Sequence, residues 1–153
     1  MHSRIFQVDT KPISDYDYIE EDNYFDHWFL NQIADYVSDD YDRDASIEWL
    51  AECANGCEID HDNNGYYLVV CDKEAYFKNK YDMFVGALNK LGIPTIDQFV
   101  NGIDMWQFES AYDDKFGFYI DSSDFGLITL DEFIRRSNEL DKYYIGGVVD
   151  YHF

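Results

Sequence analysis

The sequence of 153 residues is poor in basic side chains. Eleven Lys and Arg residues stand against 32 Asp and Glu residues, which gives a formal net charge of −21. A field of this sign and size repels nucleic acid and anionic membranes and attracts basic protein surfaces. We therefore expect no direct binding to nucleic acid or to a membrane, and we expect a basic protein as the partner.

Cysteine, proline and long apolar runs are also scarce. Three cysteines, an odd number, do not form the disulfide framework of a small secreted protein. Two prolines and no Gly/Ser-rich tract leave no linker, so we expect a single domain over residues 1–153. No apolar run approaches the roughly 20 residues that span a bilayer, and the N-terminus lacks a hydrophobic signal core. These absences favour a cytoplasmic protein.

Catalytic motifs are missing as well. The sequence has no Gly-rich phosphate loop, and it has no basic, aromatic strand of the kind that binds single-stranded nucleic acid. Carboxylates are so abundant that pairs of them arise by chance, so no acid–base dyad stands out. We therefore predict a binding protein that is not an enzyme and needs no cofactor.

Apolar residues are nevertheless plentiful. They make up 46% of the chain, and aromatic residues make up 19%, which is enough for a folded core. Hydrophobic periodicity predicts strands over residues 3–9, 66–71, 116–120 and 143–153. It predicts helices over residues 24–41, 75–91, 95–100 and 129–140. Strands and helices mix without a βαβ rhythm, so the prediction is an α+β fold, a single domain with a largely antiparallel sheet and several packed helices.

Turn and cap residues refine this prediction. Asn64-Gly65 predicts the turn of a hairpin that ends in the strand over residues 66–71. Asp44 and Ser46 are candidate caps for a short helix that contains Trp49. Gly92 is the expected C-terminal stop of the helix over residues 75–91.

Acidic and aromatic residues are interleaved in the segment ISDYDYIEEDNYFDHW, residues 13–28, which we call the acidic segment. Disordered acidic tails usually lack aromatic residues, so the mixture favours an ordered acidic surface. In the helix predicted from residue 24, Asp35, Asp39 and Asp42 follow an i, i+4, i+7 pattern and therefore share one face. The predicted partner-binding surface consists of Asp15, Asp17, Glu20, Glu21, Asp22, Asp26, Asp35, Asp39 and Asp42.

Carboxylates on such a surface can be spaced like phosphates. Neighbours on a helix face lie about 5–6 Å apart, and a DNA duplex carries one charge per about 1.7 Å of its axis. In its small size, strong acidity and α+β build, the chain resembles DNA-mimic proteins, the phage and plasmid antirestriction and anti-CRISPR inhibitors, without a shared motif. The resemblance implies an inhibitor from a mobile element that occupies the nucleic-acid-binding surface of a basic protein. The alternative is a housekeeping domain with a solvated acidic surface.

Residues 121–132, DSSDFGLITLDE, resemble the calcium-binding loop of an EF-hand. Ligand positions 1, 3 and 12 of that loop are Asp121, Ser123 and Glu132, and Gly126 and Ile128 take positions 6 and 8. Position 5 is Phe125, which has no side-chain ligand. The resemblance implies a calcium-responsive domain that uses Asp121, Ser123 and Glu132. The alternative is a hairpin-like turn followed by a capped helix.

Two further groups contain metal-ligand residue types. Cys53, Cys57, His61 and Cys71 have the spacing C-x3-C-x3-H-x9-C, which matches no structural zinc site that we can assign. Residues 60–65 begin like a calcium loop, but the twelfth position is Cys71, an unsuitable ligand for a hard cation. We therefore expect buried structural thiols and a polar hairpin tip.

Overall fold

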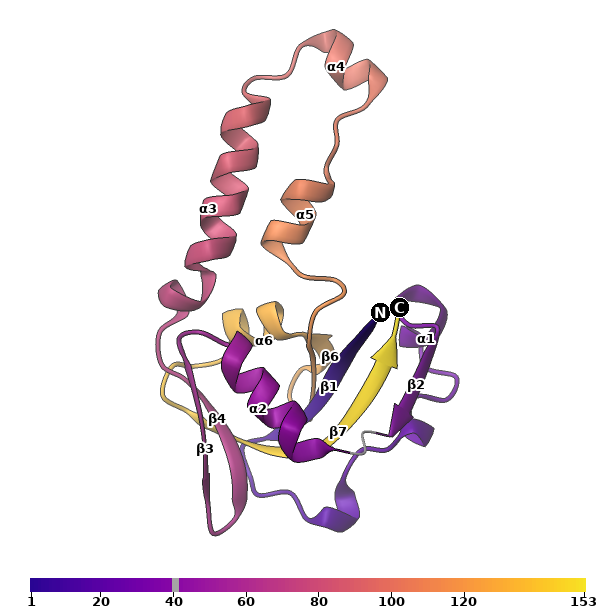
Figure 1. Cartoon of the computed structure of the whole chain (residues 1–153), viewed down its shortest axis with the longest axis vertical. Helices are drawn as coiled ribbons and strands as arrows, with labels where there is room; N and C mark the ends of the chain where they lie inside the picture. The colour runs from indigo at the N-terminus through magenta and orange to yellow at the C-terminus, as the bar shows by residue number, and fades with distance from the viewer. Residues whose placement is uncertain (40–41) are drawn as a thin grey trace.

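The computed structural model describes residues 1–39 and 42–153, which form a seven-stranded sheet, helices and a projecting arm (Figure 1). The strands are β1 (His2–Asp9), β2 (Tyr36–Asp39), β3 (Cys57–Asp62), β4 (Gly65–Val70), β5 (Tyr119–Ser122), β6 (Gly126–Thr129) and β7 (Lys142–His152). The helices are α1 (Phe29–Gln32), α2 (Arg43–Cys53), α3 (Lys73–Leu91), α4 (Ile96–Asn101), α5 (Trp106–Tyr112) and α6 (Leu130–Arg136), with 3-10 turns η1 (Asp15–Asp17) and η2 (Glu21–Tyr24). The fold is α+β, as predicted.

Strand β7 organises the sheet. It pairs antiparallel with β1 along one edge, and along the other edge it pairs with β4 near its start and with β2 near its end. The hairpins β3–β4 and β5–β6 extend the sheet on the two sides, and β5 joins β1 in parallel. The sheet is therefore largely antiparallel, in agreement with the prediction.

Side chains that alternate along the strands bury a cluster on each face of the sheet. One cluster, under α2 and α6, includes Phe6, Leu50, Phe133 and Ile145. The other cluster lies under the segment between β1 and β2 and consists of Ile5, Tyr24, Phe29, Ala34, Tyr119, Val149 and Tyr151. The segment between β1 and β2 thus covers one face of the sheet, with Tyr24 of the acidic segment and the adjacent Phe29 as its buried rings.

The helix predicted over residues 24–41 is wrong, although residues 40–41 lie outside the described residues. The chain instead forms η2, the four-residue α1 and the edge strand β2. Asp26 and Asn31 take positive φ angles of 61° and 77°, which interrupt any helix. Burial of Tyr24 and Phe29 against the sheet outweighs the local helical pattern.

Most other predicted elements are present with shifted ends. Helix α3 begins two residues earlier than predicted, with Asp72 as its cap, and it ends before Gly92 as expected. Asp42, rather than Asp44 or Ser46, caps α2. The two-residue turn of the β3–β4 hairpin is Asn63-Asn64, and Gly65 begins β4.

A bulge in β7 fixes the path of the acidic segment. The register between β1 and β7 shifts opposite Gln7. The Gln7 Oε1 atom accepts hydrogen bonds from Gly147 N (2.8 Å) and Ile19 N (3.1 Å), and its Nε2 donates to Asp17 O (2.9 Å). A Cβ atom on Gly147 would lie 2.6 Å from Ile19 N, so the segment can approach β7 this closely only because residue 147 is glycine.

We expect Gly147→Ala to lower the free energy of unfolding by about 1–3 kcal/mol, because the new methyl group meets backbone atoms that are themselves hydrogen-bonded. Urea unfolding followed by circular dichroism measures this. Gly86→Ala in α3 is the control, since a Cβ atom there meets no described atom within 4 Å beyond its chain neighbours and the backbone of α3. It should leave stability unchanged or raise it by up to about 1 kcal/mol. Similar losses from both changes would contradict the packing argument.

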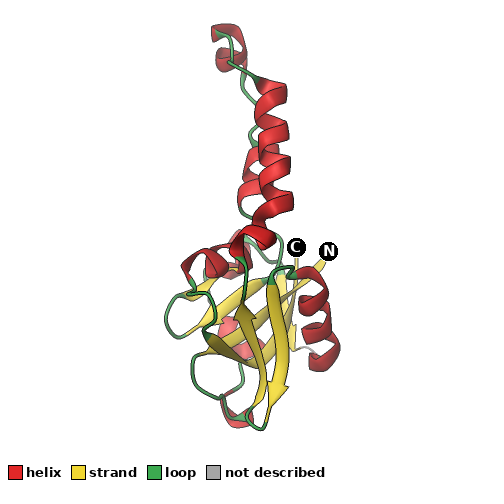
Figure 2. Cartoon of the chain, turned by 90° about the vertical axis from the view of Figure 1, so that its left-hand side faces the viewer, coloured by secondary structure: helices red, strands yellow, loops and turns green. Residues whose placement is uncertain are grey.

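The arm, residues 73–112, projects far from the sheet (Figures 1 and 2). Helix α3 leads outward, α4 forms the tip, and α5 returns beside α3. The rings of Phe84 and Phe108 pack edge to face between α3 and α5, with centroids 5.5 Å apart. Helix α5 was not predicted, and nothing in the periodicity of α3 indicates that it leaves the sheet. We call the rest of the chain the body.

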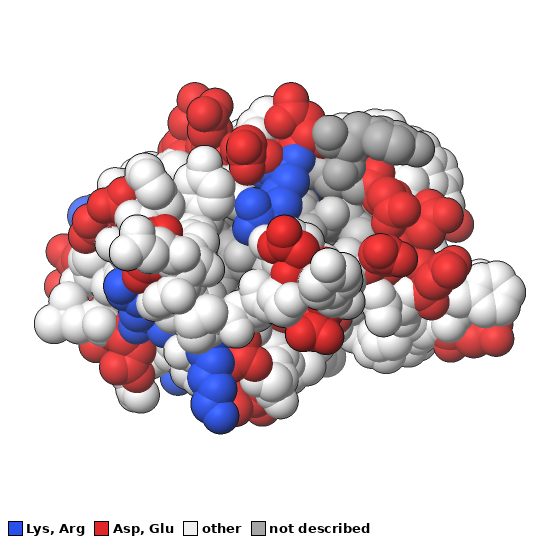
Figure 3. All heavy atoms as spheres, turned by 90° about the horizontal axis from the view of Figure 1, so that it is seen from below, with Lys and Arg blue, Asp and Glu red and all other residues white. Residues whose placement is uncertain are grey.

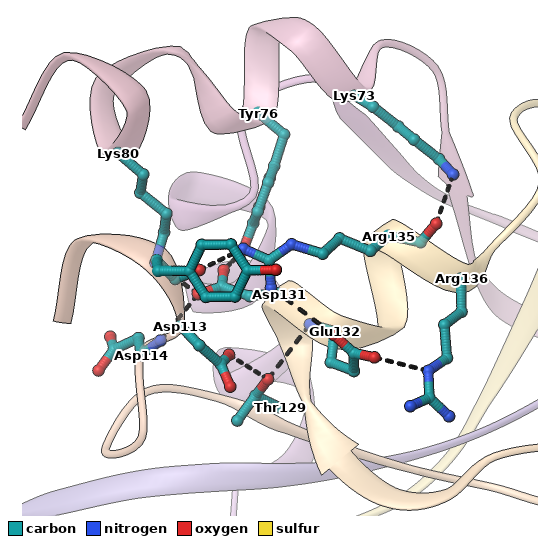
Figure 4. A network of polar contacts seen from close by, with 11 residues as sticks. Lys73, Tyr76, Lys80, Asp113, Asp114, Thr129, Asp131, Glu132, Arg135 and Arg136 are labelled. Carbon is teal, nitrogen blue, oxygen red and sulfur yellow. Dashed lines mark hydrogen bonds and ion pairs between the residues drawn. The ribbon is translucent and has the colours of Figure 1, made fainter. Parts of the chain in front are cut away.

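A buried carboxylate holds the root of the arm (Figure 4). Asp131, in α6, is 2% exposed and accepts hydrogen bonds from Tyr76 OH, Lys80 Nζ and Asp114 N, each at 2.8 Å. Two of these donors come from α3 and the third from the chain that follows α5, so one anion ties down both ends of the arm. Burial and the neighbouring Asp131 raise the pKa of Tyr76 far above its usual value, which keeps the hydroxyl a donor.

Cation–π contacts reinforce the same junction. The Arg135 guanidinium, also from α6, lies over the rings of Phe77 (4.7 Å) and Tyr112 (4.1 Å), which belong to α3 and α5. Lys73 Nζ donates to the Arg135 carbonyl at 2.9 Å. Helix α6 therefore sets the direction in which the arm leaves the body.

Lys80→Met should lower the free energy of unfolding by about 2–3 kcal/mol, because it leaves the buried Asp131 carboxylate without its cation. Lys78→Met is the matched control in the same helix. Lys78 pairs with Asp82, and both side chains are more than half exposed, so its loss should cost less than about 1 kcal/mol. Chemical denaturation of the two variants tests this difference. Equal effects would mean that the buried ion pair does not hold the arm.

Candidate acidic interaction surface

The nine predicted carboxylates are all exposed, but they lie on several short elements instead of one helix. Asp15 and Asp17 belong to η1, and Glu20 precedes η2. The remaining residues are Glu21 and Asp22 in η2, Asp26 in the following loop, Asp35 before β2, Asp39 at the end of β2 and Asp42 at the cap of α2. The predicted carboxylates are therefore exposed as expected, but the helix that was predicted to carry three of them does not form.

The helical stripe of Asp35, Asp39 and Asp42 does not form, because β2 replaces the helix. Asp35 and Asp39 lie near opposite ends of β2, about 13 Å apart at the rise of an extended strand. Each of the three carboxylates has a structural partner. Asp35 Oδ2 lies 3.2 Å from His152 Nδ1, Asp39 Oδ1 accepts from Glu21 N at 2.8 Å, and Asp42 Oδ1 accepts from Ala45 N at 3.1 Å.

The bond between Glu21 and Asp39 brings η2 against β2 and so joins two parts of the acidic surface.

The negative charge is unevenly distributed between the body and the arm. The body contains 27 acids and seven bases (net −20), whereas the arm contains five acids and four bases (net −1). At the end of the molecule away from the arm, acidic side chains spread widely and basic ones are few (Figure 3). The charge is therefore segregated in the body.

Buried aromatic rings fasten the acidic segment. Tyr24 is 1% exposed and Phe29 is fully buried. The Phe29 ring packs edge to face on Tyr119 (4.7 Å) and Tyr151 (5.0 Å). Tyr24 OH donates to Asp121 Oδ2 at 2.7 Å, and burial, together with this carboxylate, raises the pKa of Tyr24 far above its usual value. The carboxylates of the segment are thus carried on a backbone whose position is fixed by packing.

Other aromatic residues of the same region remain exposed. Tyr16 is 99% exposed, Phe25 is 79% exposed and Trp28 is 46% exposed. The Tyr36 ring stacks on His152 at 5.1 Å beside Asp35. Exposed aromatic rings are enriched where proteins contact other proteins. The surface consequently combines fixed negative charge with apolar contact area.

Arg43 is a functional residue of this scaffold that sequence reasoning missed. Its Nε and Nη2 atoms donate to the carbonyls of Gly146 (2.7 Å) and Ile145 (2.8 Å), which lie on the edge of β7 between its pairings with β4 and β2. The guanidinium also lies 5.0 Å from the centroid of the Tyr18 ring. An isolated arginine among acids was the available signal.

The residues of the EF-hand-like stretch do not converge on one point. Asp121 bonds to Tyr24, the Ser123 hydroxyl donates to Asp9 Oδ2 at 2.8 Å, and Glu132 Oε1 accepts from Arg136 Nε at 2.7 Å. Residues 119–129 form the β5–β6 hairpin, and Thr129 caps α6. The stretch has the geometry of the alternative, a hairpin followed by a capped helix.

The cysteines likewise form no cluster with His61. Across residues 1–39 and 42–153, no group of three His, Cys, Asp or Glu side chains is placed to hold a metal ion. Cys57 is half-buried, but Cys53 and Cys71 are exposed, so the prediction of buried thiols is wrong for these two. They lie at the end of α2 and just beyond β4, where the chain turns at the surface. Burial and the nearby Cys71 raise the pKa of Cys57 to about 12.

A cavity of about 330 Å³ lies at the root of the arm. Its lining includes Trp49, Phe118, Lys80 and Asp131. The charged residues of the lining are Lys80, Asp114 and Asp131, and both Lys80 Nζ and Asp114 N already donate to the Asp131 carboxylate. The cavity therefore adds nothing to the acidic surface.

Comparison of the chain with models of known families, with curated proteins and with solved structures gave no match. Among the described helices, none is both long and apolar enough to cross a membrane.

The cysteine environments can be tested by thiol labelling at pH 8. Only the thiolate reacts, and a pKa of about 12 leaves on the order of one Cys57 in ten thousand ionised at that pH. We expect Cys53 and Cys71 to be modified in the folded protein and Cys57 only after denaturation, as read by peptide mass spectrometry. Equally rapid labelling of all three residues would contradict the packing of Cys57.

Proposed function

We propose that the chain is a non-enzymatic binding protein that engages a basic, nucleic-acid-binding protein through its acidic surface, as a DNA mimic does. The observation that carries the proposal is the combination of exposure and anchorage in the acidic segment. Its carboxylates face solvent, while Tyr24 and the loop at Ile19 are fixed to the sheet.

Anchorage matters because a mimic must present its charges without first ordering them. Ordering a flexible acidic tail on binding would cost conformational entropy for each immobilised residue. Here the Gln7 side chain and the Gly147 backbone hold the segment before any partner arrives. The exposed rings of Tyr16, Phe25 and Trp28 add apolar contact area within the same surface.

The proposal extends to the kind of partner, the compartment and the genetic origin of the protein. An antirestriction-like or anti-CRISPR-like inhibitor would act on a nucleic-acid enzyme in the cytoplasm and would be encoded on a mobile element. The net charge of −20 on the body supports rapid, salt-sensitive association with such a protein. It equally disfavours direct contact with nucleic acid or with an anionic membrane.

The test uses competition by DNA. Proteins from a lysate are retained on the immobilised chain at low salt and then eluted with duplex DNA or with polyglutamate of equal total charge. Under the proposal, duplex DNA elutes a nucleic-acid-binding protein at concentrations at which polyglutamate does not. Equal elution by both polymers would reduce the interaction to net charge, and elution of no nucleic-acid-binding protein would contradict the proposal.

Charge reversal locates the surface on the molecule. Asp17, Glu21 and Asp22 are exposed, and among the described residues none bonds to their carboxylates, so changing all three to Lys should preserve the fold. We expect this variant to associate with the eluted protein at least about tenfold more slowly at low salt, with a smaller defect at high salt. Reversal of Glu52, Glu58 and Asp124, exposed acids elsewhere on the body, is the charge-matched control. Equal defects in the two triple variants, measured by surface plasmon resonance, would exclude the acidic segment as the site.

A further inference from the structure

The tip of the arm is apolar and uncovered. Ile93 is 96% exposed, Ile96 is 78%, Phe99 is 70% and Val100 is 73%. Helix α4 contains no buried residue, although Thr95 and Gln98 form a complete capping box at its start. Isolated helices shorter than about 12–15 residues are marginal in water, so the six residues of α4 need a covering surface to be stable.

The apolar residues of α4 form a ridge with helical spacing. Ile96, Phe99 and Val100 stand at positions i, i+3 and i+4 of α4 and share one face, while Ile93 precedes the cap Thr95. The polar residues Asp97 and Asn101 are bonded to each other, with Asn101 Nδ2 3.0 Å from Asp97 Oδ1. The ridge is the pattern with which an amphipathic helix enters an apolar groove.

A groove of matching character lies on the same arm. Two adjoining hollows share Ala87 and Lys90 in their linings. One, of about 340 Å³, lies between α3 and α5, and the other, of about 320 Å³, extends toward the tip, where Gln98 and Asp104 also line it. Gly86 forms part of the lining, and a Cβ there would meet no described atom within 4 Å beyond its chain neighbours and the backbone of α3. Met83 and Trp106, which are 62% and 68% exposed, flank the groove. The arm therefore presents both a ridge and a groove.

The low net charge of the arm favours a second copy of the arm as the occupant of the groove. The arm has a net charge of −1, and residues 91–103 contain a single charged residue, Asp97. A basic partner is drawn to the body, at −20, and finds no comparable attraction at the tip. A second copy of the arm, in contrast, matches this nearly neutral, apolar surface without like-charge repulsion.

The length of the arm keeps two acidic bodies apart. The 19 residues of α3 extend for about 28 Å, several times the screening length of about 8 Å at physiological ionic strength. Arms that pair antiparallel place the bodies at opposite ends, where their repulsion is screened. Parallel arms would bring the bodies side by side and incur that repulsion.

The area available is adequate for a stable pair. Fully exposed large side chains present on the order of 150–250 Å² each. With the exposures of Ile93, Ile96, Phe99, Val100, Met105 and Trp106, the tip and the adjoining start of α5 together offer roughly 800 Å² per copy, the size of a standard interface. An open helical hairpin that pairs with another hairpin also completes a four-helix arrangement.

We propose that the arm is a homodimerisation element in which two copies pack their arms antiparallel, with the α4 ridge of each copy in the α3–α5 groove of the other. This arrangement has the two-fold symmetry of most protein dimers. The inference is independent of the acidic-surface proposal, since it concerns the purified chain alone.

Sedimentation velocity over a concentration series from about 1 to 200 μM in 0.15 M NaCl tests the pairing by mass action. The wild-type chain should shift from monomer to dimer within this range. Phe99→Glu places a carboxylate in the apolar contact and should raise the dimer dissociation constant by about a hundredfold. Phe25→Glu is the matched control, because it makes the same substitution at an exposed ring in the acidic segment, and it should leave dimerisation unchanged.

Gly86→Gln provides a second variant whose folding is not in question. The added side chain enters open space in α3 and improves helix propensity, yet it fills the groove and should weaken the dimer at least about tenfold. Small-angle scattering of the wild-type dimer should show two compact bodies at the ends of a narrow rod. A chain that stays monomeric throughout the series, equal effects of Phe99→Glu and Phe25→Glu, or a dimer with its bodies in contact would each overturn the proposal.

Discussion

The two glycines in the middle of β7 are the constraint on which the acidic half of the molecule depends. Their backbone groups cannot all pair with neighbouring strands, since β1 is out of register and β4 and β2 leave a gap between them. Side chains satisfy them instead, with Gln7 bonded to Gly147 N and Arg43 bonded to Gly146 O. The acidic segment, which carries much of the negative charge, is held in place by these bonds. The sheet must therefore form before the carboxylates of the segment have fixed positions.

Carboxylates serve two opposite purposes in this chain. Most of them face water and repel one another, which opposes compaction of a body of net charge −20. Asp131 differs from them, because among the described carboxylates it is the one that is buried, and it accepts three hydrogen bonds. The exposed carboxylates act at long range through their summed field, whereas Asp131 acts only at contact, where it fixes the arm. Aromatic rings show the same division, since Phe29 anchors the acidic segment and Phe99 is free at the tip.

Local sequence signals predicted those elements whose stability is local. Helix α3, with Asp72 before it and Gly92 after it, and the hairpin ending in β4 belong to this class. The helix predicted over residues 24–41 was wrong because the position of Phe29 is set by packing on Tyr119 and Tyr151. These residues lie about a hundred positions away in the sequence, outside any short window of local periodicity. The members of the acidic surface were predictable from composition, but their scaffold was not. The arm was missed because an apolar helix face gives the same pattern whether it packs on a sheet or projects from it.

The separation of the arm from the body also makes the charge distribution asymmetric along the long axis of the molecule. Nearly all of the net charge lies at one end of the long axis, while the helices at the other end are almost neutral. Charge and mass therefore have different centres, and the molecule has a large electric dipole moment along this axis. In the field of an approaching cation-rich protein, such a dipole turns the acidic end forward before contact. Fewer collisions then arrive in an unproductive orientation, which relaxes the orientational requirement that limits most protein association rates.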